Sequence, residues 1–94
     1  MKILYLSLKA EWYDMIESGV KTEEYRDIKP YWTKRLTVDN GPMMRDYTYV
    51  CFSYGYTERR MTFEVENITI GRGKPEWGAP EDRDVFIIKL GKKN

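Results

Sequence analysis

One short polar segment, residues 19–26 (Gly-Val-Lys-Thr-Glu-Glu-Tyr-Arg), carries the side chains best suited to chemistry. Lys21 is a point cation that can contact a phosphate, or lose its proton when it is desolvated. Glu24 can accept from an amine or act as a base, and Arg26 presents a planar fork to phosphate or carboxylate. Alternation along a strand places the Thr22 hydroxyl on the face of Glu24 and Arg26. The segment therefore predicts a polar cleft.

The same segment also permits a purely structural interpretation. Gly19 suits the left-handed position after a helix, where it acts only as a cap. Glu24 and Arg26, two residues apart on a strand, can form a surface ion pair that contributes about 0–1 kcal/mol. Runs of charged residues are commonly solvated faces, so both interpretations stay open at this point.

A second candidate surface is aromatic and basic. Trp32 falls in a predicted helix after the polar segment. Trp77 falls in a Gly- and Pro-rich loop, residues 71–84, together with Arg72 and Lys74. A loop tryptophan can stack on a base while cations hold phosphate, which contributes about 1–3 kcal/mol per stacked base. Trp77 can equally close the open end of a small barrel.

Missing residue types exclude several chemistries. The chain has no histidine, which removes His-based acid–base catalysis, Cys-His dyads and His-ligated metal sites. The single cysteine, Cys51, excludes an intramolecular disulfide and a Cys-rich zinc site, and its apolar neighbours predict a buried strand position. The acidic residues of 81–84 are typical of a solvated turn. We expect no metal and no cofactor.

Composition indicates one globular domain over residues 1–94. Lys and Arg total 16 and Asp and Glu total 15, so the net charge is +1 and any anion binding must come from local clustering. Hydrophobic residues make up 41%, but none of the apolar runs approaches the roughly 20 residues of a membrane helix. The apolar start is cut short by Lys9 and lacks a cleavage site. We therefore expect a cytoplasmic protein without membrane contact.

Periodicity predicts about five strands and two short helices. Asn67 shifts the phase of one strand, which indicates a bulge or barrel corner. A sheet that closes into a barrel leaves few strand edges with unpaired backbone groups. We therefore predict an α+β fold with a small, closed or nearly closed mixed β-barrel. The predicted strands are 3–8, 21–26, 47–54, 61–70 and 85–90, and the predicted helices are 10–18 and 30–36.

The pattern Gly19-x-Lys21-x-x-Glu24-x-Arg26 resembles the G-x-K-x-x-E-x-R signature of ASCH (activating signal cointegrator homology) domains. The opening strand and helix and the closing residues 85–90 also resemble that family, so the resemblance covers most of the chain and fits a small single-domain member of bacterial or phage type. It implies a PUA-like β-barrel that binds RNA or a modified nucleoside in a cleft beside the signature. The candidate binding residues are Gly19, Lys21, Thr22, Glu24, Arg26, Trp32, Arg72, Lys74 and Trp77.

Two further hypotheses accompany RNA binding. Some bacterial ASCH relatives are amidohydrolases acting on acetylated cytidine, with a catalytic Lys at the place of Lys21, a Thr at the place of Glu24 and a later Glu. Other members are reported as ribonucleases. A metal-independent hydrolase is therefore the alternative, although this chain departs from those amidohydrolases in having Glu24 instead of Thr. In such a hydrolase Lys21 would activate water or attack, with Glu24 or Glu76 as proton carrier and Arg26 holding charge in the transition state. The third hypothesis is a protein-interaction module with an inert cleft and a contact patch at residues 54–56.

Overall fold

Alternating leucines form the first strand, β1 (Ile3–Leu8), of the computed structural model, which describes residues 2–94. Helix α1 (Ala10–Glu17) follows with apolar residues at helical spacing. Gly19 then adopts a φ of +86°, the left-handed conformation that ends the helix as predicted. The side chains that β1 and α1 bury are Leu4, Leu6, Leu8, Tyr13 and Ile16.

The remaining elements match the predicted order. Helix α2 begins at Pro30 and ends at Leu36 as predicted, because proline suits the first helical turn. The sequence prediction of an α+β fold with five strands and two short helices is confirmed. The elements after α1 are β2 (Glu23–Asp27), α2 (Pro30–Leu36), β3 (Tyr49–Tyr54), β4 (Arg60–Gly71), the short 3₁₀ helix η1 (Pro75–Trp77) and β5 (Val85–Lys93).

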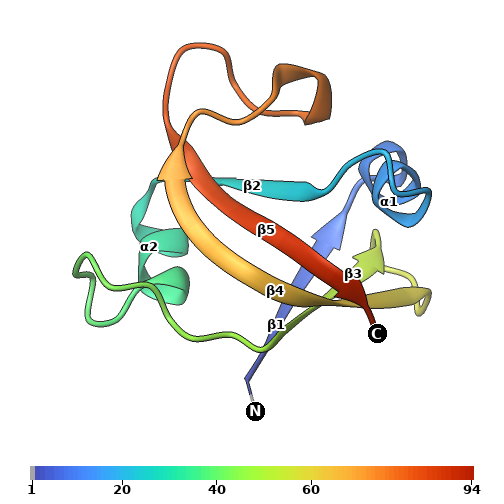
Figure 1. Ribbon diagram of the computed structural model, residues 1–94, viewed down its shortest axis with the longest axis horizontal. Helices are drawn as coiled ribbons and strands as arrows, with labels where there is room; N and C mark the ends of the chain where they lie inside the picture. Colours follow the sequence, from blue (N-terminus) through green and yellow to red (C-terminus); the bar gives the residue numbers. More distant parts are fainter. Residues whose placement is uncertain (1) are drawn as a thin grey trace.

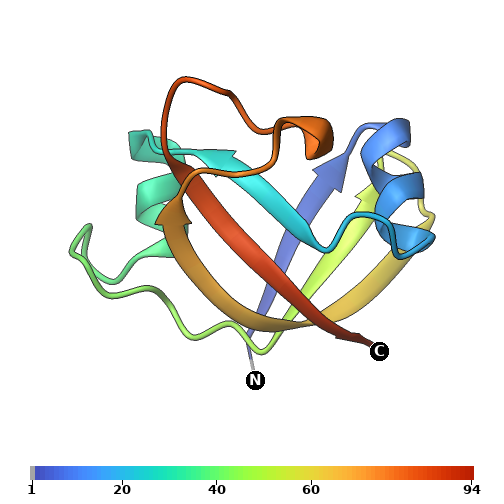
Figure 2. The same ribbon diagram turned by 45° about the horizontal axis from the view of Figure 1, so that its top comes forward.

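The five strands form one curled mixed sheet in the order β1-β3-β4-β5-β2 (Figure 1). The β1–β3 pair is parallel, and the other three pairs are antiparallel. The register of β4 against β5 shifts on either side of Val65, close to the predicted bulge. These shifts accompany the bend that carries β4 around the core (Figure 2).

The sheet curls into a half-barrel whose two end strands, β1 and β2, face each other across the opening. Figure 2 shows β2 crossing above β1, with the loop of residues 72–84 next to it. One side chain bridges the opening, because Arg26 Nη2 on β2 donates to the Ser7 carbonyl oxygen on β1 at 3.1 Å. The opening of the curled sheet is therefore where polar side chains of β2 are found.

A second, smaller apolar cluster fixes the loop of residues 72–84 to the sheet. Tyr25, Ala79 and Val85 are buried together, with Trp77 and Ile87 packed against them. This cluster is separate from the main core, which lies inside the curled sheet. The loop is therefore held by packing contacts of its own. The main core is built from Leu4, Leu6, Leu8, Tyr13, Ile16, Leu36, Val50, Phe52, Met61, Phe63, Ile68, Phe86, Ile88 and Leu90.

Cys51 differs from its predicted environment. It was expected to be buried, but it is only half-buried on β3. Its neighbours Val50 and Phe52 are fully buried, and successive residues of a strand point to opposite faces. Cys51 therefore lies on the outer face of the sheet. Within residues 2–94, none of the helices is long and apolar enough to cross a membrane.

Candidate functional site

The turn between α1 and β2 positions Lys21. The Lys21 backbone N–H donates to the Met15 carbonyl oxygen at 3.0 Å, which holds the residue against the end of α1. The side chain is only 2% exposed. Its Nζ lies 2.9 Å from Glu24 Oε1 and donates to the Trp77 carbonyl oxygen at 2.5 Å. Strand alternation extended back to residue 21 would place Lys21 on the face opposite Glu24, but β2 begins only at Glu23 and the two side chains meet.

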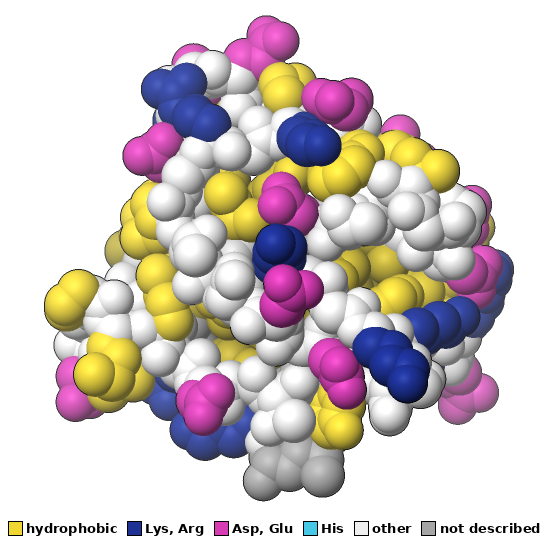
Figure 3. Space-filling view, viewed as in Figure 1, with side chains coloured by type: hydrophobic (Ala, Val, Ile, Leu, Met, Phe, Trp, Pro, Cys, Tyr) yellow, Lys and Arg dark blue, Asp and Glu magenta, His cyan; other side chains and the backbone are white. Residues whose placement is uncertain are grey.

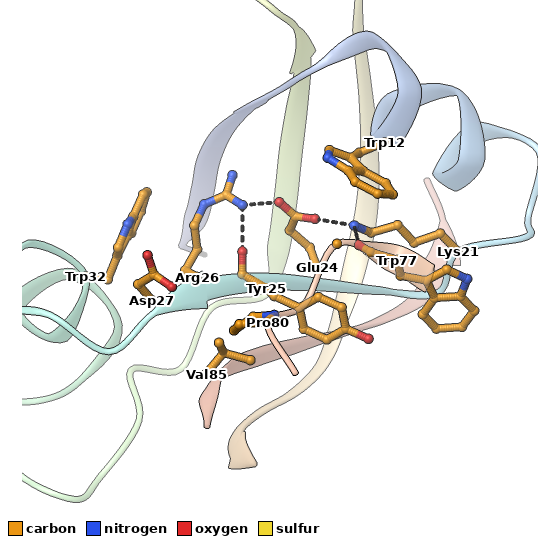
Figure 4. A pocket seen from close by; sticks show the side chains of 11 residues that line it. Trp12, Lys21, Glu24, Tyr25, Arg26, Asp27, Trp32, Trp77, Pro80 and Val85 are labelled. Atoms are coloured by element: carbon orange, nitrogen blue, oxygen red, sulfur yellow. Dashed lines mark hydrogen bonds and ion pairs between the residues drawn. The ribbon is translucent and has the colours of Figure 1, made fainter. Parts of the chain in front are cut away.

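Glu24 is the centre of a polar chain that joins three side chains. It is 4% exposed, and its two carboxylate oxygens contact different cations. Oε1 faces Lys21, and Oε2 accepts a hydrogen bond from Arg26 Nη1 (Figure 4). Arg26 Nη1 also donates to the Tyr25 carbonyl oxygen at 2.8 Å. Two cations and one carboxylate give this Lys21–Glu24–Arg26 chain a formal charge of +1.

Aromatic rings cover both cations of the chain. Lys21 Nζ lies 4.6 Å from the centre of the Trp12 ring, and Arg26 Cζ lies 5.1 Å from the Trp32 ring. Both distances are within the range of cation–π attraction. Figure 4 shows Trp12 and Trp32 at opposite ends of the polar chain. The two rings leave a polar stretch, centred on Glu24, between them.

These side chains line a hollow of about 260 Å³ at the opening of the half-barrel. All three tryptophans of the chain belong to its lining. The loop of residues 72–84 supplies one wall, and β2 supplies another. The lining consists of Trp12, Lys21, Glu24, Tyr25, Arg26, Asp27, Trp32, Trp77, Gly78, Pro80 and Val85.

Tyr25 ties the loop wall to β2. Its hydroxyl donates to Glu23 Oε1 at 2.8 Å and accepts from the Lys74 backbone N–H at 3.1 Å. Burial raises the pKa of Tyr25, and the Glu23 carboxylate raises it further, although the Lys74 N–H opposes them. The phenol is therefore a neutral donor well above physiological pH. Gly73 lies against this ring, where an added Cβ would come within 2.7 Å of it.

The structure brings five of the predicted site residues together. All five line the hollow, although they come from separate segments of the chain. Three come from the polar segment, one from α2 and one from η1. The five are Lys21, Glu24, Arg26, Trp32 and Trp77.

Four predicted site residues lie outside the lining of the hollow. Gly19 serves as the helix cap at an exposed turn. Thr22 is exposed because it precedes β2, and its carbonyl oxygen accepts from the Leu90 N–H at 3.0 Å. Arg72 turns away to other partners, 3.1 Å from Asp84 and 2.9 Å from the Glu81 carbonyl oxygen. The fourth, Lys74, stacks 4.3 Å from the Trp77 ring instead of entering the hollow.

Residues named in the alternative hypotheses are also placed. Glu76 is exposed and lies outside the lining of the hollow. In the patch of residues 54–56, Tyr56 is fully exposed, but the Tyr54 ring packs edge-to-face on Tyr13 at 5.1 Å. Arg59 covers Tyr54 at 4.9 Å. That patch therefore offers one free aromatic side chain.

Trp12 is the main lining residue that sequence reasoning missed. Its place among the apolar residues of α1 predicted core packing, but it is half-buried and lines the hollow. Gly78 packs against the indole so closely that a Cβ at residue 78 would lie 3.0 Å from the ring. No local pattern links residues 12 and 78. The only sequence signal was the indole N–H on an otherwise apolar helix face. Tryptophan favours positions where one end of the ring is buried and the N–H reaches a polar group or solvent.

Within the described part of the chain, no three acidic or cysteine side chains cluster in a way that could hold a metal ion. In comparisons with known proteins, no family model matches the chain, and no curated protein matches it. The resemblance to ASCH domains therefore stays a prediction that rests on the residues quoted above.

Proposed function

We propose that this chain binds a single nucleobase, of RNA or of a modified nucleoside, in the hollow beside the Lys21–Glu24–Arg26 chain. One observation carries the proposal. Three interlinked charged side chains share one small hollow with every tryptophan of the protein. The resemblance to ASCH domains supports the same function, because these residues fill three of the four signature positions.

The chemistry of the lining suits a planar, hydrogen-bonding ligand. A carboxylate offers about four lone-pair sites, and Glu24 uses two of them, one on Lys21 and one on Arg26. Its remaining lone pairs can accept from amino or imino groups of a base. A guanidinium has five N–H donors, so Arg26 can also donate to a carbonyl or phosphate oxygen. Indole faces add sequence-tolerant stacking.

The size and charge of the hollow restrict the ligand further. Its volume of about 260 Å³ is below the roughly 300–1,000 Å³ of pockets that hold drug-sized molecules, which favours one base. Proteins usually read RNA through unpaired bases that are splayed out, stacked and hydrogen-bonded in this way. The single cysteine fits a reducing compartment such as the cytoplasm, where RNA is the expected partner.

Calorimetric titration with cytidine, acetylated cytidine, adenosine, guanosine and uridine tests the proposal. We expect at least one nucleoside to bind, and Glu24→Gln to abolish binding because it weakens the acceptor and unbalances the two cations. Trp32→Leu should cost about 1–3 kcal/mol of binding free energy, the value of one stacked base. Glu58→Gln, at an exposed position away from the hollow, is the matched control. Equal affinities of the Glu24→Gln and Glu58→Gln proteins would rule out the proposal.

A hydrolase is the second candidate, favoured by the 2.9 Å contact between Lys21 Nζ and Glu24 Oε1 inside the hollow. Such a pair can donate and accept protons at a bound substrate. Lys21 also donates to the Trp77 carbonyl oxygen, so two of its three N–H donors have partners. The third can donate to a developing oxyanion. Turnover of acetylated cytidine and of short RNAs by wild type, lost in Lys21→Ala, would support it. Turnover that survives Lys21→Ala excludes this mechanism.

A further inference from the structure

A row of stacked cations and aromatic rings leaves the hollow along α2. Arg26 Cζ lies 5.1 Å from the Trp32 ring, and Trp32 meets Tyr31 edge-to-face at 4.8 Å. Arg35 Cζ then lies 3.6 Å from the Tyr31 ring, and its Nη1 donates to the Tyr31 carbonyl oxygen at 3.2 Å. Each member contacts the next. This α2 row, Arg26-Trp32-Tyr31-Arg35, therefore connects the hollow to the far end of the helix.

The α2 row ends at a second depression, the basic hollow, of about 330 Å³. Its lining is Lys34, Arg35, Arg45 and Tyr47, three cations and a phenol without a carboxylate. Two hydrogen bonds shape it. Arg45 Nη2 donates to the Lys34 carbonyl oxygen at 3.2 Å, and the Tyr47 hydroxyl donates to the Arg35 carbonyl oxygen at 2.7 Å.

The basic hollow gathers three cations around one depression that has no carboxylate in its lining. Some arginines elsewhere pair with carboxylates, as in Arg59–Glu17 and Arg72–Asp84. Within residues 2–94, the ion pairs include none of the three cations of the basic hollow. Arg45 Nε is moreover buried without a hydrogen-bond partner. Three cations without ion pairs in the described part of the chain therefore lie around one depression, and this arrangement can accommodate an anion.

We infer that the ligand is a single strand of nucleic acid, not a free nucleoside, with flanking nucleotides along the α2 row and a phosphate in the basic hollow. The inference rests on the proposed function. A helix rises about 1.5 Å per residue, so Arg35 lies about 4.5 Å beyond Trp32 along α2. A strand advances about 3.4 Å per nucleotide in a duplex and more when extended. The basic hollow is thus within reach of the nucleotides next to the bound base.

The test compares one nucleoside with a labelled RNA of about ten nucleotides that contains it, a length that covers one small binding domain. The variant is Lys34→Gln/Arg35→Gln, and the matched control is Lys92→Gln/Lys93→Gln at the exposed end of β5. We expect RNA affinity to fall about five- to tenfold in the variant only. The slope of log affinity against log salt concentration should become shallower by about 0.7, the value of one lost phosphate contact. Nucleoside affinity should not change.

The outcomes separate this inference from the proposed function. If wild type binds neither ligand, the nucleobase site fails, and the inference fails with it. If nucleoside and RNA bind equally, or if variant and control lose RNA affinity equally, the inference is overturned while the nucleobase site stands.

A second measurement needs no variant. In NMR titrations of the wild-type chain, the backbone amide signals of Lys34 and Arg35 should shift with the RNA. They should stay in place with the nucleoside alone. Shifts of equal size with both ligands would contradict a separate contact with flanking nucleotides.

Discussion

Glu24 holds the polar chain together, because it is the only carboxylate in direct contact with Lys21 and Arg26 among the described ion pairs. Both Lys21 and Glu24 are almost completely buried. A buried charge is tolerated when it is paired and becomes costly when its partner is removed. The stability of the fold and the chemistry of the hollow therefore depend on the same atoms.

The first prediction concerns this dependence. Glu24→Ala should lower the free energy of unfolding by about 3–5 kcal/mol, because it leaves a buried lysine without a carboxylate. Lys21→Met should cost less, because Glu24 keeps its contact with Arg26 and the methionine fills the same space. Urea denaturation of both variants measures the difference. If Lys21→Met is the more destabilising change, Arg26 does not compensate Glu24 as described.

The second prediction concerns Tyr25 and alkaline pH. Burial raises the pKa of Tyr25 above its ordinary value of 10.0, so the unfolded chain loses this proton at lower pH than the folded chain. The free energy of unfolding should therefore be insensitive to Tyr25 below about pH 10 and fall as the pH rises above it. Tyr25→Phe should make that fall shallower in urea titrations.

In Tyr25→Phe the free energy of unfolding should still fall to some extent as the pH rises above about 10. Burial also raises the pKa of Tyr13, which contributes in the same direction. Below about pH 10 the variant should in addition be less stable by about 1 kcal/mol, the value of the hydrogen bond to Glu23, and this difference should shrink as the pH rises further. If the free energy of unfolding fell equally steeply with pH in the variant and the wild type, the Tyr25 phenol would ionise equally in the folded and unfolded states, which would contradict the prediction.

At the scale of elements, the loop of residues 72–84 forms a wall of the hollow and depends on close backbone packing. A Cβ at Gly73 would lie 2.6 Å from Ala79 Cβ and 2.7 Å from the Tyr25 ring. Gly73→Ala should thus push the loop from the sheet and cost about 1–3 kcal/mol, as overpacking does. Thermal unfolding and nucleoside titration should both register the change.

Gly71→Ala is the matched control for Gly73→Ala. A Cβ at Gly71 meets only Ile87 Cδ1 at 3.6 Å, an ordinary contact. The control should leave stability and binding close to wild type. Equal effects of the two substitutions would mean that the loop is not held by its packing on Tyr25.

The elements were predictable wherever local signals are strong. Alternating apolar residues predicted β1, and Pro30 predicted the start of α2. The phase shift near Asn67 predicted the bulge of β4. These features depend on neighbours in the chain, which a sequence displays directly. The α+β fold followed from them.

The candidate site was predictable only in part, because its walls come from distant segments. Glu24 and Arg26 share a face by strand alternation, as expected. The same rule failed for Lys21 and Thr22, because β2 begins at Glu23 and alternation does not extend before it. Trp12 was missed because its neighbour in space, residue 78, is remote in sequence.

At the scale of the whole molecule, positive and negative charges are nearly balanced in number. On the face shown in Figure 3, acidic and basic side chains are interspersed. The net charge of +1 provides little long-range attraction. Recognition must therefore depend on local contacts, chiefly those of the hollow.

This balance gives a prediction about salt. Nucleoside affinity should change by less than about twofold between low and physiological salt, because no phosphate is contacted and no counterion is released. Calorimetry at several salt concentrations measures it. A steep salt dependence for an uncharged nucleoside would contradict recognition by stacking and hydrogen bonding.

Tryptophan fluorescence tests the nucleobase site most directly, because all three tryptophans of the protein line the hollow. Titration of the wild-type chain with the nucleoside that binds should change most of the emission in a saturable way. Glu24→Gln should remove the saturable change, and Glu58→Gln should retain it. Emission that stays constant while calorimetry reports binding would place the ligand elsewhere on the molecule and contradict the account.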